Sequence, residues 1–447
     1  MTGSAVLALA EALVVAVGCA SLADLCLGLR SRSLFEWNQS FLAGLGIVSA
    51  VTIGLSPFGW PWLRLGLLIA LLIAVLIRRP TVEMRAPRRA EAPGVTLAAA
   101  GVGLFVWSNA HTAYGWDGFQ IWMTKAEIFF HTGSLALAVP TPGYMGRIAG
   151  YPPAVPVAEA VLASFHRSFP FAEVKAVFPI FALSALVGTF RLVEILTDAR
   201  TAAAATGLTA FLPGLMMGSA LGGYADLPLA SVAVAAAGGL LETKRRGALS
   251  WRDRTPWLLG TLPMVKAEGI ILLAIGVGIF TAAGLRTRRP RLRHVVPFLA
   301  PVAVFLGACV LQGRLAPGRN VEFAPVTSLR VHTVLERGPR IVSGIGHWLL
   351  HFPSWGVLWP AFAVAGVVLG LRAPRSPETA LAAAVAVTVS AEGAMFFLTR
   401  WGDYRLHLDQ AYPRLISQVS PIAVAVIAAA LFGFRSPVPD SGSDRRP

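Results

Sequence analysis

Long apolar stretches recur along this chain and constrain its fold more than any other feature. They run for about 17 to 25 residues, the length an α-helix needs to cross the hydrocarbon core of a bilayer. Apolar residues make up 55% of the 447 residues and charged residues only 14%, which does not fit a soluble globular protein. Mean hydropathy is +0.65. Because lipid offers no partners for backbone polar groups, we predict an all-α, polytopic helical membrane protein.

The net charge of +15 does not indicate a nucleic-acid partner, because the basic residues lie in short loops between apolar stretches. Placing these loops on the cytoplasmic side orients the chain. The stretch 256–285 is basic at both flanks, so we expect it to form a short helical hairpin with its turn at Lys266–Gly269. We therefore expect about thirteen spans, near 5–29, 38–55, 62–78, 95–113, 174–196, 202–220, 226–242, the 256–285 hairpin, 295–311, 355–371, 379–398 and 417–434.

Charges outside the cytoplasmic loops collect on the opposite side of the membrane in this topology. They include Asp117, Asp226, Lys266 and Arg414. Basic residues of membrane proteins usually lie in cytoplasmic loops. Arginines on the opposite side therefore indicate an anionic ligand, because the guanidinium fork matches phosphate oxygens. Asp117 also has a structural interpretation as the N-cap of an amphipathic helix over 117–131, and both roles are compatible. For residues 400–409, an ordinary outer loop with weak surface ion pairs is the alternative.

Several short motifs follow one another along the chain. They are Asp117 after a span, Lys125-Ala126, Tyr151-Pro152-Pro153, Gly223 to Pro228, Lys266 to Gly269, and Arg414 with Gln418 and Pro421. Their order resembles the GT-C superfamily of membrane glycosyltransferases over residues 95–434. It is similar to the bacterial branch that includes aminoarabinose and mannosyl transferases acting from polyprenyl-phosphate sugars. Two features depart from the family pattern: three extra spans precede the span that leads into the first outer loop, and a single Asp117 is followed by Gly118. The latter leaves a divalent metal open as a cofactor.

The resemblance implies transfer of a sugar from a polyprenyl-phosphate carrier to a glycan, lipid or protein acceptor at the outer face of a bacterial inner membrane. Asp117 would be the catalytic base. Lys266 and Arg414 would hold the phosphate. The remaining candidate substrate-binding residues are Lys125, Glu127, Tyr151, Asp226, Glu268, Arg400 and Arg405, of which Asp226 would shape the pocket and Glu268 would hold Lys266.

On this basis the chain divides into four parts. They are 1–94 with extra spans and a basic cytoplasmic loop, 95–285 as the GT-C-like catalytic module, 286–434 with C-terminal spans and outer loops, and 435–447 as a disordered cytoplasmic tail. Two alternatives remain open. A secondary transporter would also use broken helices and buried charges, although no inverted repeat is visible. A polymerase or ligase of lipid-linked glycans fits the motif order less well. The three cysteines lie in apolar segments and indicate no disulfide framework.

Overall fold

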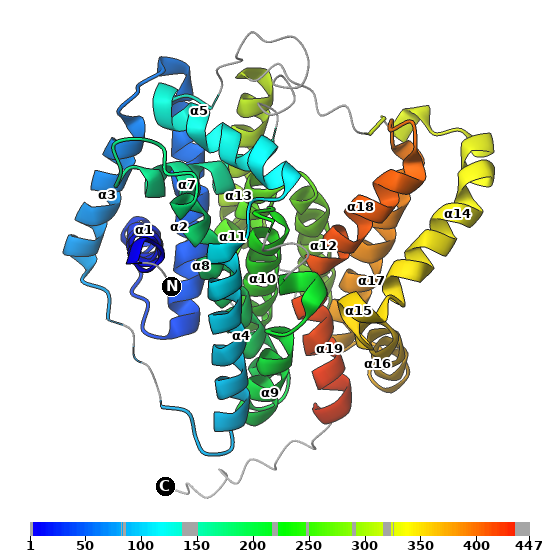
Figure 1. The fold of residues 1–447 in the computed structure, drawn as a ribbon. Coiled ribbons are helices and arrows are strands. Elements are labelled where there is room, and N and C mark those ends of the chain that lie inside the picture. Colours follow the sequence, from blue (N-terminus) through cyan, green and yellow to red (C-terminus); the bar gives the residue numbers. More distant parts are fainter. Residues whose placement is uncertain are drawn as a thin grey trace, which may run out of the picture.

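The computed structural model describes residues 3–81, 83, 86–135, 151–216, 222–246, 250–287, 292–315, 323–324 and 326–433. Across these ranges the chain is helical, and its only β feature is one antiparallel bridge between Phe323 and Thr399 (Figure 1). The all-α prediction is therefore confirmed for the described residues. The tail expected to be disordered, 435–447, lies outside them.

The helices are α1 (Gly3–Leu27), α2 (Leu34–Leu55), α3 (Leu63–Arg78), α4 (Ala92–His111), α5 (Thr124–Thr132), α7 (Ala154–Ala163), α8 (Val177–Leu196), α9 (Ala199–Thr209), α10 (Asp226–Arg246), α11 (Arg254–Val265), α12 (Gly269–Thr287), α13 (Leu292–Leu315), α14 (Val331–Leu349), α15 (Phe352–Trp355), α16 (Leu358–Arg372), α17 (Pro377–Met395), α18 (Tyr404–Ser417) and α19 (Ser420–Phe432). A π-helical segment, Gly118–Met123, leads directly into α5. Short 3-10 turns lie at Ser56–Phe58, Glu173–Ala176, Val326–Ser328 and Phe396–Leu398.

Six of the described helices are long and apolar enough to cross a membrane, or seven if the bent pair α18–α19 is one span. The expected count of about thirteen is not confirmed. Several apolar stretches are divided into helices too short to cross alone: α9 has 11 residues, α11 has 12 and α19 has 13. At 1.5 Å per residue these reach only about 16 to 20 Å, against the ~30 Å of a hydrocarbon core. The span expected near 202–220 is one of these, since α9 ends at Thr209.

The first helices pack into the same hydrophobic core as the middle of the chain. Asn38 Nδ2 of α2 donates to the Ser184 carbonyl of α8 at 3.2 Å, and both residues are buried. At this same N-terminal end of α2, Ser33 and Glu36 form a capping box that begins the helix. In Figure 1, α1 to α3 lie on one side, α14 to α18 on the other, and α8 and α10 between them. Residues 1–94 therefore form one flank of a continuous helical body.

A buried ion pair connects this flank to α11. Arg254 Nη2 lies 3.2 Å from Asp24 Oδ1, and Arg254 Nε donates to Ser40 Oγ at 2.6 Å. Ser40 Oγ in turn donates to Asp24 Oδ1 at 2.5 Å. Because Asp24 lies on α1 and Ser40 on α2, the first residue of α11 is held by both helices. The hairpin that begins at Arg254 is thereby fixed at its basic end.

The helical hairpin predicted for 256–285 is present. Helix α11 ends at Val265, α12 begins at Gly269, and the intervening residues form a turn. Further from the turn, Gly276 of α12 faces the Leu259 side chain of α11, as antiparallel packing requires. A Cβ at Gly269 would collide with the Leu262 carbonyl oxygen, so only glycine lets the chain reverse this tightly. The turn presents Lys266 and Glu268 to the interior of the molecule.

Candidate functional site

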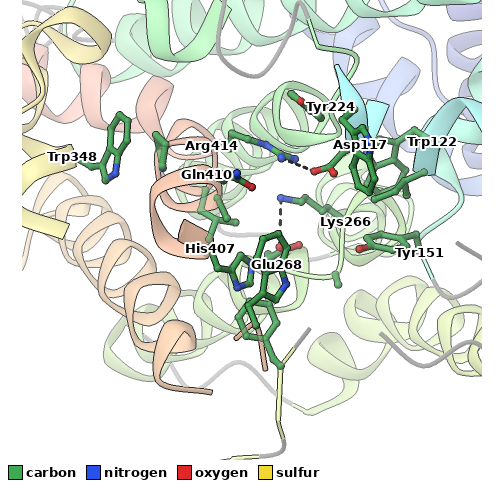
Figure 2. A pocket seen from close by; sticks show the side chains of 18 of the residues that line it. Asp117, Trp122, Tyr151, Tyr224, Lys266, Glu268, Trp348, His407, Gln410 and Arg414 are labelled. Carbon is green, nitrogen blue, oxygen red and sulfur yellow. Dashed lines mark hydrogen bonds and ion pairs between the residues drawn. The ribbon is translucent and has the colours of Figure 1, made fainter. Parts of the chain in front are cut away.

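A cavity of about 820 Å³ lies where the segment from Trp116 to Trp122, the α11–α12 turn and α18 meet (Figure 2). This volume is within the range of small-molecule sites, roughly 300–1,000 Å³. Its walls are rich in aromatic rings, and in Figure 2 its charged groups gather between Trp348 on one side and Trp122 and Tyr151 on the other. Four of the residues singled out from the sequence for charge line it, namely Asp117, Lys266, Glu268 and Arg414, and so does Tyr151.

Asp117 does not cap a helix. Its backbone is already helical, with φ −64° and ψ −37°, and its side chain makes no capping hydrogen bond, so the N-cap prediction is wrong. The carboxylate instead accepts a hydrogen bond from Arg414 Nη1 at 2.6 Å. The neighbouring Gly118 allows this placement, because a Cβ there would collide with the Gly222 carbonyl oxygen. The segment carrying Asp117 thus lies directly against the turn that precedes Asp226.

Asp226 is the central anion of the charged cluster. It is the first residue of α10 and 0% exposed. Its Oδ1 accepts from Lys266 Nζ at 2.7 Å and from Gln418 Nε2 at 2.8 Å. Its Oδ2 accepts from Arg414 Nε at 3.2 Å. Asp226 is not among the residues that line the cavity. It therefore orients the two cations, whereas the sequence had indicated a residue that shapes the pocket directly.

Lys266 joins two carboxylates of different exposure. Besides Asp226, its Nζ lies 3.4 Å from Glu268 Oε1, two residues further along the same turn. Figure 2 shows the Lys266 and Glu268 side chains converging at the cavity wall. The prediction that Glu268 holds Lys266 is supported by this contact. The extended backbone of Lys266, at the C-terminus of α11, points its side chain toward α10 and not along the hairpin.

Arg414 reaches the cluster because the last helices bend. Helices α18 and α19 meet at 53°, and Gln418 lies in the break between them. The bend brings both Arg414 and Gln418 against Asp226. One face of the Arg414 guanidinium is covered by the Tyr224 ring, whose centroid lies 3.8 Å from Cζ. Of its nitrogens, Nε contacts Asp226 and Nη1 contacts Asp117.

Lys125 is placed behind the cavity wall. It is 3% exposed, and its ammonium donates to the Tyr151 carbonyl oxygen, which also accepts from Gln312 Nε2 at 2.7 Å. Burial lowers the pKa of Lys125 to about 7. The Tyr151 ring lies edge-on to Trp122, with 5.4 Å between centroids, and both rings line the cavity. Lys125 thus positions a cavity-lining residue and does not itself face the cavity.

Three predicted substrate-binding residues are not brought to the cavity. Glu127 is half-buried on α5, whereas Arg400 and Arg405 are exposed near the start of α18. None of them is among the described residues that line the cavity. The loop that contains Arg400 does contribute Trp401 to the cavity wall.

An aromatic stack on the cavity wall was missed by the sequence reasoning. The His407 ring lies between Trp401, at 4.3 Å and 9° between planes, and Phe323, at 5.3 Å and 29°. Thr399 Oγ1 and His407 Nδ1 lie 2.6 Å apart, which fixes the ring. All three rings face the cavity. Trp401 and His407 share one loop and helix start, but no pattern in the sequence could have indicated Phe323.

The charged cluster contains three carboxylates and two cations: Asp117, Asp226 and Glu268 with Lys266 and Arg414. Each carboxylate contacts a cation. In the part of the chain that the structure describes, no group of three or more His, Cys, Asp or Glu side chains could hold a metal ion. The arrangement is suited to proton transfer beside a positively charged anion-binding pair.

Comparison with known proteins adds no family assignment: no protein-family model matches the chain, and no curated protein matches it.

Proposed function

We propose that this membrane protein is a glycosyltransferase that moves a sugar from a polyprenyl-phosphate carrier to an acceptor at the non-cytoplasmic face. One observation carries the proposal. Asp117, the candidate base, lies against Arg414 at the wall of an aromatic-lined cavity, and Arg414 shares Asp226 with Lys266. Transfer of a sugar from a glycosyl phosphate requires a base for the acceptor and positive charge for the leaving phosphate. A base and two cations lie beside this one cavity.

The reaction breaks the bond between the anomeric carbon and a phosphate oxygen and forms a bond from that carbon to the acceptor oxygen or nitrogen. The acceptor proton moves to the Asp117 carboxylate. The electron pair of the broken bond leaves with the polyprenyl phosphate, whose added negative charge Arg414 and Lys266 stabilise. By analogy with single oxyanion-hole donors, each such cation contributes on the order of 3–4 kcal/mol.

Asp226 supports this chemistry by fixing the two cations before the substrate arrives. Its carboxylate is fully buried, so the cations that it holds need little reorganisation when the leaving phosphate develops charge. The aromatic rings, including Tyr151 and Trp401, are suited to packing against the apolar faces of a sugar. A lipid-linked donor is in keeping with the described helices that are long and apolar enough to cross a membrane.

The proposal is tested by assaying the purified protein in detergent with a panel of polyprenyl-phosphate sugars, using wild type and Asp117→Asn. We expect Asp117→Asn to abolish transfer while the donor lipid still binds. Asp253→Asn is the matched control, because Asp253 precedes α11 at the end opposite Lys266 and pairs with Arg246 at 3.7 Å. Full turnover by Asp117→Asn would remove Asp117 as the base. Substrate movement across liposomes without transfer by the wild type would favour a transporter.

A further inference from the structure

The three carboxylates of the charged cluster differ in how firmly they are held. Asp226 has no exposed side-chain surface and receives three hydrogen bonds, from Lys266, Arg414 and Gln418. Asp117 and Glu268 have 29% and 16% of their side chains exposed, and both line the cavity. Each of these two carboxylates pairs with one cation. Asp226 therefore stays bound to both cations, whereas Asp117 and Glu268 are exchangeable, because a ligand in the cavity can replace each of them on its cation.

From this difference we infer that the site binds a single phosphate group by exchange: the phosphate replaces Asp117 on Arg414 and Glu268 on Lys266. The inference rests on the proposed function in taking the phosphate to be that of a lipid-linked donor. Its consequence is that donor binding itself releases the Asp117 carboxylate from Arg414. Asp117 then accepts the acceptor proton, so the base becomes active only when the leaving group is in place.

Exchange is favoured over simple addition by the geometry around Arg414. Tyr224 covers one face of the guanidinium, Nε is committed to Asp226, and Nη1 is committed to Asp117. A phosphate that seeks two parallel hydrogen bonds along the guanidinium edge meets the Asp117 carboxylate at that position. Of the two carboxylates that Arg414 contacts, Asp226 is fully buried and only Asp117 has exposed surface into which it can move.

Charge leads to the same conclusion. The cluster has three negative and two positive groups, so a phosphate added without displacement would place four anions around two cations. Like charges brought within about 4–6 Å of one another repel strongly in a partly buried site. Moving Asp117 and Glu268 outward leaves the phosphate and Asp226 to face the two cations. Two cations match one phosphate better than a diphosphate, which fits a sugar joined to the lipid through one phosphate.

Binding of inorganic phosphate and of farnesyl phosphate, measured by titration calorimetry on the purified full chain in detergent, tests the exchange without any sugar transfer. We expect Asp117→Asn to bind both probes at least about tenfold more tightly than wild type, because a competing anion is removed. Glu268→Gln should show a smaller gain, since its contact with Lys266 is longer. Asp226→Asn should bind more weakly, because the two cations lose their common support.

Asp409→Asn is the charge-matched control. Asp409 lies on the same helix as Arg414, accepts a hydrogen bond from Trp348 Nε1 at 3.1 Å, and among the described residues pairs with neither cation. Its affinity should stay within about twofold of wild type. Equal gains in Asp117→Asn, Asp226→Asn and Asp409→Asn would show a long-range charge effect and overturn the exchange.

Unchanged phosphate affinity in Asp117→Asn would also overturn it. If that variant does not fold, Glu268→Gln decides, because an unchanged affinity there contradicts exchange at Lys266. The outcome is separable from the proposed function. If the variants show the expected order of phosphate affinities but the protein has no transferase activity, the exchange is retained and the glycosyltransferase is rejected. If the wild type transfers sugar but Asp117→Asn shows no gain in phosphate affinity, the glycosyltransferase is retained and the exchange is rejected.

Discussion

Replacing Asp226 with asparagine should destabilise the protein far more than the same change at Asp117. Asp226 is fully buried, with Lys266 Nζ at 2.7 Å and Arg414 Nε at 3.2 Å. The side chains of these two cations are only 9% and 20% exposed, so they would remain in the interior without their shared counter-ion. Removing one partner of a buried ion pair costs about 3–5 kcal/mol, and we expect Asp226→Asn to fall in this range.

Asp117 provides the comparison. It pairs with Arg414 through one hydrogen bond of 2.6 Å, and its side chain is 29% exposed, so water can solvate the groups that remain. Arg414 also keeps its contact with Asp226. Exposed pairs contribute about 0.2–1 kcal/mol, and partial burial places Asp117→Asn near the upper end, at ~1 kcal/mol.

Both values are measured by unfolding the purified variants in mixed detergent micelles, followed by far-UV circular dichroism, with wild type and Asp253→Asn run beside them. The difference between the two variants should be about 2 kcal/mol or more. If Asp117→Asn were the more destabilised variant, or Asp226→Asn were as stable as wild type, the assignment of Asp226 as the structural centre of the cluster would be wrong.

Three further predictions concern other parts of the molecule. Lys266→Ala should weaken donor binding and turnover together, and unchanged donor affinity in a binding titration would remove Lys266 from the phosphate site. Arg254→Ala should cost about 3–5 kcal/mol in the same unfolding assay, because it leaves Asp24 buried without its cation. Stability should rise with pH from about 7 toward 10, since Lys125 has a pKa of about 7 when folded and 10.5 otherwise, and the unfolded state binds more protons in that window. Lys125→Met should show a smaller rise in thermal scans across the same pH range.

Local signals predicted much of the architecture. The turn at 266–269 was located from its basic flanks, and the span expected near 226–242 corresponds to α10, which begins at Asp226. The number of spans was not predictable in the same way. Hydropathy measures the apolarity of a stretch, but α9 and α18–α19 show that helix ends and bends inside such a stretch depend on the neighbouring helices.

The candidate site was predicted in part for a related reason. Asp117, Lys266 and Arg414 stood out because a charge beside or within an apolar stretch is costly wherever it lies. Lys125 also stood out as a charge, yet it supports Tyr151 from behind the wall. Exposed loop arginines such as Arg405 carried the same charge signal without reaching the cavity.

The sequence by itself determined that this chain forms apolar helices and which of its charges need a partner, because apolar length and charge position are properties of short segments. Only the tertiary structure decided which partners meet. Asp226 joins Lys266, 40 residues away, to Arg414, 188 residues away, and Asp117 meets Arg414 across 297 residues. Contacts over such separations follow from helix packing. Packing brings five charges together in one cluster, with Asp226 buried at its centre and two exchangeable carboxylates at the cavity wall.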